Sequence, residues 1–104
     1  MAPEDAIMRE RLRILRGRIL ETLCMYRSRA VLDVQITQLE SLIRDHRRDE
    51  IETQCGYLAE KGYVVDATRR VDHRDRRDVG AVRITAAGID LVEGTIADEG
   101  VVFG

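Results

Sequence analysis

Several residue types are scarce in this chain of 104 residues, which has no tryptophan, one proline and two cysteines. Cys24 and Cys55 lie far apart on apolar helical positions, so we expect reduced thiols in the core rather than a disulfide framework. The only histidines, His46 and His73, stand among arginines and are expected to be exposed. No ligand spacing typical of zinc sites is present, so neither a metal nor another cofactor is expected.

Long apolar runs are also missing. No stretch approaches the roughly 18 consecutive apolar residues that cross a membrane. The first residues, MAPEDAIMRERLR, include no apolar secretory core. These absences predict a soluble, cytoplasmic protein. A Gly-rich phosphate loop and a Ser/His/Asp grouping are absent as well, so we do not expect an enzyme.

The chain does contain many charged residues, which make up 35% of it, beside 44% hydrophobic residues. This balance predicts one folded domain, and the net charge is −2. All 17 basic residues precede Asp90, and all but Lys61 are arginine, whereas residues 90–104 carry acids only. A weakly basic body with an acidic end is compatible with nucleic-acid binding but does not require it.

The N-terminal part predicts one long helix over residues 4–27, because apolar residues recur at spacings of three and four. Gly17 predicts a bend in it. The expected core stripe is Met8, Leu12, Leu15, Ile19, Leu23 and Tyr26. Ile7, Ile14 and Leu20 lie outside this stripe, which indicates that the helix buries a second face.

Shorter elements are expected in the middle of the chain. Residues 29–32 are compatible with a short extended segment, and Asp33 or Thr37 can cap a second helix that runs to about Asp45. After a polar turn, a third helix is expected from about Asp49 to Lys61, ended by Gly62.

The pattern then changes to a period of two. Residues 63–65 and 81–85 are expected to pair as an antiparallel hairpin, and the polar segment 66–80 forms its long tip. Residues 86–93 predict a short closing helix capped by Thr85. The expected domain therefore covers residues 1–94, and residues 95–104 form an acidic and apolar tail.

Two local motifs resemble those of winged helix-turn-helix proteins. Leu58-Ala59-Glu60-Lys61-Gly62-Tyr63-Val64 resembles the junction between recognition helix and wing, and Arg83-Ile84-Thr85-Ala86-Ala87-Gly88-Ile89-Asp90-Leu91 resembles the segment that closes the wing. The resemblance covers about residues 5–94 and implies an α+β fold with three helices, a two-stranded β-wing and a short C-terminal helix. It also implies that Thr85 caps the last helix and that Gly88 permits close packing.

Within that superfamily the chain is similar to ArsR/MarR-like regulators. The segment Gly88-Ile89-Asp90-Leu91-Val92-Glu93-Gly94-Thr95, with the tail that follows, resembles small winged-helix proteins of Mu-like phages and prophages. The cysteine motif of metal-sensing ArsR repressors is absent, so metal sensing is not implied.

The resemblance implies a transcriptional regulator that binds double-stranded DNA. The recognition helix of such a fold lies in the major groove, and the wing contacts phosphates or the minor groove. The implied DNA-binding residues are Arg47, Arg48, Thr53, Gln54, Tyr57, Arg69, Arg70, Arg74, Arg76 and Arg77. Asp49, Glu50 and Glu52 do not suit a groove lined with phosphates, so a winged-helix module that binds protein through its acidic third helix is the alternative.

A surplus of apolar residues predicts a homodimer. Ile7, Ile14 and Leu20 on the first helix and Ile89, Leu91 and Val92 on the last are the expected interface residues. The alternative is that a bend at Gly17 lets both faces of the first helix pack within one chain.

Overall fold

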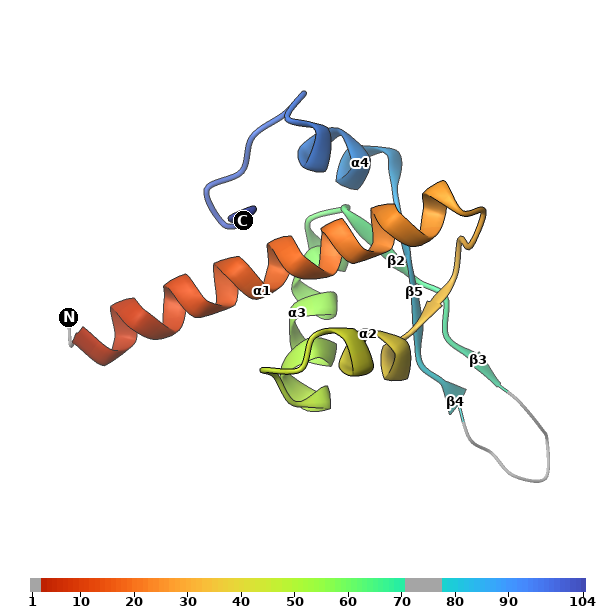
Figure 1. Cartoon of the computed structure of the whole chain (residues 1–104), viewed down its shortest axis with the longest axis horizontal. Coiled ribbons are helices and arrows are strands. Elements are labelled where there is room, and N and C mark those ends of the chain that lie inside the picture. The colour runs from red at the N-terminus through yellow and green to blue at the C-terminus, as the bar shows by residue number, and fades with distance from the viewer. Residues whose placement is uncertain (1–2, 71–77) are drawn as a thin grey trace.

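The computed structural model describes the backbone of residues 3–70 and 78–104, and side chains over the same ranges except residues 69, 70, 78 and 79. In these residues four helices surround a small antiparallel sheet (Figure 1). The helices are α1 (Pro3–Ser28), α2 (Ile36–Leu42), α3 (Arg48–Glu60) and α4 (Ala86–Glu93). The strands are β1 (Val34–Gln35), β2 (Val64–Asp66), β3 (Arg69–Arg70), β4 (Asp78–Val79) and β5 (Ala81–Ile84). The expected α+β class is confirmed, and the order of elements is compatible with a winged helix.

The sheet has the order β1-β5-β2, with both pairings antiparallel. Val64 lies opposite Ile84, as the expected hairpin requires, and the hairpin continues outward as the β3–β4 pair. The third strand, β1, corrects the expectation of a two-stranded wing, since Val34 lies opposite Val82.

Strand β1 begins at Val34, and not within residues 29–32, because the residues directly after α1 close the C-terminus of that helix. The backbone N–H of Val31 donates to the carbonyl of Tyr26, that of Ala30 donates to Arg27, and Ala30 has a φ of 64°. This is the Schellman closure of a helix C-terminus, with alanine where glycine is usual.

The start and end of α2 also differ from expectation. The side chain of Gln38, and not that of Asp33 or Thr37, caps the N-terminus of α2, because its Oε1 accepts a hydrogen bond from the Gln35 N–H at 3.0 Å. The helix ends at Leu42, not near Asp45, because the backbone leaves the helical conformation at Ile43, which has a φ of −104° and a ψ of 78°.

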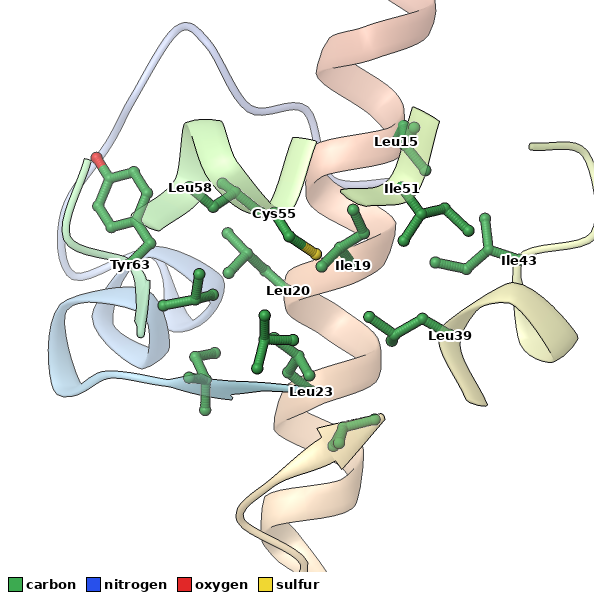
Figure 2. Close-up of a cluster of buried hydrophobic side chains, with 14 of the residues drawn as sticks. Leu15, Ile19, Leu20, Leu23, Leu39, Ile43, Ile51, Cys55, Leu58 and Tyr63 are labelled. Carbon is green, nitrogen blue, oxygen red and sulfur yellow. The ribbon is translucent and has the colours of Figure 1, made fainter. Parts of the chain in front are cut away.

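The hydrophobic core forms around the second half of α1 (Figure 2). Leu15, Ile19 and Leu23 are buried as expected, and residues of α2, α3 and the sheet pack against them. Leu20 is also fully buried, because α1 contacts α3 as well as α4 and β5. Met8 is half exposed, which corrects its place in the core stripe: the first turns of α1 project beyond the other elements in Figure 1.

The α4 end of the fold confirms the roles expected for Thr85 and Gly88. The Thr85 Oγ1 accepts from the Gly88 N–H at 3.1 Å and donates to the Gly62 carbonyl at 2.6 Å. A Cβ on Gly88 would lie 2.3 Å from the Tyr63 carbonyl oxygen. The two motifs that carry the winged-helix resemblance are therefore in direct contact, and Gly62 has the left-handed φ of 81° expected of a residue that ends a helix.

Residues 94–104 fold back onto α1, and Figure 1 shows this segment returning beside the middle of that helix. Val101 is buried in the core, and the Val102 N–H donates to the Arg13 carbonyl at 3.0 Å. A Cβ on Gly17 would lie 1.9 Å from the Val102 carbonyl oxygen. The lack of a side chain at Gly17 therefore leaves room for the tail. The expectation of a bend is wrong, because α1 is continuous through this position and runs straight in Figure 1.

Within the described ranges, no helix is both long and apolar enough to cross a membrane.

Candidate nucleic-acid interface

The turn between α2 and α3 is fixed to α1 by polar contacts. Arg11 donates from Nη2 to the Asp45 carbonyl at 3.0 Å and lies 3.6 Å from the Glu50 carboxylate. The His46 side chain is only 5% exposed, and its Nδ1 lies 3.4 Å from Glu50 Oε2 and 3.4 Å from Arg11 Nη2. This burial corrects the expectation of an exposed histidine. For His73, the expectation falls outside the described residues.

Glu50 links this cluster to the first turn of α3. Its Oε1 accepts from the Arg47 backbone N–H at 3.3 Å, as in half of a capping box. This hydrogen bond and the one with His46 hold the pKa of Glu50 below its usual value. The Glu50 carboxylate therefore caps the N-terminus of α3 and also interacts favourably with the positive end of the helix dipole.

Two residues expected to contact DNA point into the protein instead. Gln54 is 5% exposed, and its Oε1 accepts from Arg16 Nε at 2.8 Å. The Arg16 guanidinium lies 3.7 Å from the centre of the Tyr57 ring and also donates to the Gly100 carbonyl. Gln54 is thus occupied by α1, and half-buried Tyr57 contacts Arg16 and lies against the tail at Gly100.

The sequence contained the signal for Gln54, because position 54 is three residues from Ile51 and four from Leu58, on the same buried stripe.

The outward face of α3 is acidic. Arg48, Asp49, Glu52 and Thr53 are exposed there. Arg48 Nε is 2.9 Å from Glu52 Oε1, which neutralises its charge locally, and Thr53 Oγ1 donates to the Asp49 carbonyl. The Asp49 carboxylate, which remains, repels phosphate, so this face is poorly suited to the major groove of DNA.

The arginines differ in whether they are paired. Most of those with described side chains contact an acid or a carbonyl group, as Arg18 does with Asp45 and Arg83 with Asp33. Arg44 and Arg47 are exposed in the α2–α3 turn and form no ion pair among the described residues. This turn, the start of α3 and the β3–β4 extension all lie toward the lower side of Figure 1.

The β3–β4 extension positions part of the expected wing. Arg69 lies opposite Val79 and Arg70 opposite Asp78 in the backbone pairing. The side chains of these two arginines, and the whole of Arg74, Arg76 and Arg77, fall outside the described part of the chain.

The expected dimer residues divide into two groups. Ile7 is 69% exposed and Ile14 is 39% exposed, so both are open on α1. Leu20 and Leu91 are core residues, which corrects their assignment to a free surface, while Ile89 and Val92 are partly buried against the core.

The cysteines are free thiols, as expected, with Cys55 in the core and Cys24 only partly buried against it. Burial raises the pKa of Cys55 to about 12 and also raises that of Cys24, so both remain protonated at neutral pH. Among the residues whose placement is described, no group of three His, Cys, Asp or Glu side chains lies together in a way that could hold a metal.

Comparisons with models of known protein families, with curated proteins and with solved structures found nothing that matches this chain.

Proposed function

We propose that this chain is a DNA-binding transcriptional regulator of winged-helix type that contacts the phosphate backbone from the α2–α3 turn and the β3–β4 extension. The observation that carries the proposal is the pair of exposed arginines, Arg44 and Arg47, which have no acidic partner among the described residues. Both belong to the turn between α2 and α3, and Figure 1 shows this turn and the β3–β4 pair toward the lower side of the view.

This mode of binding differs from ordinary major-groove recognition. Gln54 and Tyr57 are engaged within the chain, and the acids of α3 are unfavourable next to phosphate. Phosphate contacts position a protein on DNA, whereas base contacts give sequence specificity. We therefore expect binding that depends weakly on base sequence and strongly on salt.

Fluorescence anisotropy with a labelled random-sequence duplex at two salt concentrations tests the proposal. Each phosphate contact contributes about −0.9 to the slope of log K against log salt. The double variant Arg44→Ala, Arg47→Ala is expected to make the slope shallower by about 2. The matched control, Arg9→Ala with Arg29→Ala, also removes two exposed arginines that form no ion pair in the described structure, and it should leave the slope unchanged.

A second function, a winged-helix module that binds protein, is favoured by the acidic face of α3. In that case duplex DNA would not bind even at low salt, and neither double variant would change the result.

We also propose that the protein is a homodimer that uses the exposed apolar side of α1. Ile7 and Ile14 are one heptad apart and both open to solvent. Light scattering at micromolar concentration should give twice the mass of one chain. The Ile14→Glu variant should give a mass closer to that of a single chain. The mass of a single chain for the unmodified protein would refute this.

A further inference from the structure

A groove lies between α3 and the base of the hairpin formed by β2 and β5. Its volume is about 410 Å³, which is within the usual range of ligand pockets. One wall is formed by α3 with Glu52, Gly56 and Ala59, and the other by Asp66, Gly80 and Ala81 of the hairpin. None of the residues expected to bind DNA lines it except Arg48.

Gly56 is the unusual residue in this groove. It lies within a helix of 13 residues, and a Cβ there would meet nothing within 4 Å. Gly17 and Gly88 differ, because a Cβ on either would collide with backbone. An alanine would stabilise an exposed helical position by about 1 kcal/mol relative to glycine. Nothing within the described chain requires this glycine, and its effect is to leave the α3 backbone uncovered on the groove wall.

The opposite wall also contains small residues. Gly80 and Ala81 lie there beside Asp66 and Thr68, and the only atoms near a Cβ on Gly80 would be those of Ile36. The glycine and alanine residues on both walls allow the backbone of a bound segment to approach closely at those positions.

The chemistry of the groove indicates what it binds. Apolar side chains, Ile36, Cys55 and Val82, form its inner surface. At the rim, Glu52 has its charge paired with Arg48, and the Asp66 carboxylate accepts two hydrogen bonds from Thr68 but has no basic partner among the described residues. An apolar group fits the interior, and a cation fits the rim.

We propose that this groove binds a short segment of a partner protein in which an apolar side chain stands next to lysine or arginine. Because Arg48 and Glu52 are paired with each other, the Asp66 carboxylate sets the charge of the rim and favours a basic segment over phosphate. The interior accommodates the apolar side chain, and the glycine and alanine residues of the walls leave room for the backbone of the segment. Arg48, the one lining residue expected to bind DNA, is paired with Glu52, so the site does not use the phosphate contacts proposed for Arg44 and Arg47.

A library of random twelve-residue peptides displayed on phage, selected against the full chain, tests the proposal. We expect the selected peptides to combine an apolar residue with lysine or arginine. A synthetic peptide from this set should bind Gly56→Leu and Ala59→Leu at least tenfold more weakly, because each leucine fills the groove. Asp66→Lys should weaken binding by reversing the charge at the rim.

The matched control is Thr53→Leu, which adds an exposed leucine to the same helix but does not line this groove. It should bind the peptide like the unmodified chain, and circular dichroism should show that each variant is folded. Failure to enrich any peptide, equal binding to Gly56→Leu, or selection of acidic peptides would overturn the proposal. So would a loss of duplex DNA binding in Gly56→Leu, which would assign the groove to DNA. Loss of DNA binding in the Arg44, Arg47 variant does not affect this test.

Discussion

Replacing Gly17 by alanine is expected to destabilise the protein, although the same change stabilises most helices. Glycine in a helix interior costs about 1 kcal/mol relative to alanine. Here a Cβ would lie 1.9 Å from the Val102 carbonyl oxygen and 2.8 Å from its carbonyl carbon. These are backbone atoms, so the clash is relieved only if residues 100–103 move away from α1.

The magnitude follows from what that movement exposes. Val101 is buried in the core, and uncovering such a side chain costs about 1.5–3 kcal/mol. The hydrogen bond from the Val102 N–H to the Arg13 carbonyl contributes about 1 kcal/mol more. After the gain in helix propensity is subtracted, we expect Gly17→Ala to lower the free energy of unfolding by about 2 kcal/mol.

Urea denaturation followed by circular dichroism measures this difference. Gly56→Ala is the matched control, because its Cβ meets open space, and it should raise the free energy of unfolding by about 1 kcal/mol. In a chain shortened to end at Glu99 the clash is removed, so Gly17→Ala should there become stabilising as well. If Gly17→Ala stabilises the full chain as much as Gly56→Ala does, the contact between the tail and α1 is not what fixes glycine at this position.

Three further predictions concern other parts of the molecule. Ala30→Gly should raise the urea midpoint, with a gain of about 0.5–1 kcal/mol, because alanine at a φ of 64° is strained. The pKa of Asp98 is lowered to about 2, chiefly by the hydrogen bond from the Tyr63 hydroxyl at 2.5 Å and further by Lys61. Because folding lowers this pKa, the stability that ionised Asp98 contributes is present above the ordinary pKa near 4 and is lost as pH falls toward 2. Acid titration of unfolding should therefore show a loss of about 2 kcal/mol that Asp98→Asn lacks, and an identical pH profile in the variant would contradict the assignment. Replacing Arg74, Arg76 and Arg77 of the hairpin by alanine should weaken DNA binding and change the free energy of unfolding by less than about 1 kcal/mol. Unchanged DNA affinity would contradict the role of the wing.

The sequence was most informative where the local pattern is dense. The long run of apolar residues at helical spacing predicted α1 to within one residue at each end. Gly62 marked the end of α3, and Thr85 with Gly88 marked the start of α4, because each has a conformational or capping role that few other residues fill.

It was least informative where a residue's partner is distant in the chain. Position 54 lies on the buried stripe of α3, but that stripe does not reveal the partner of the Gln54 amide, which is Arg16 on another helix. His46 is buried because Arg11 and Glu50 both lie next to its ring. The two-residue strand β1 has too short a pattern to detect and forms because β5 offers it an edge. These features depend on tertiary packing rather than on local periodicity.

The return of the tail to α1 has a consequence for the order in which the protein is made. Arg16 and Gly100 are separated by 84 positions yet share a hydrogen bond. Ribosomes add about 5–20 residues per second, so the strip of α1 around Gly17 is synthesised roughly 4–17 s before the residues that cover it. During that interval the Arg13 carbonyl, the Arg16 guanidinium and the surface at Gly17 lack the partners that residues 100–103 later supply.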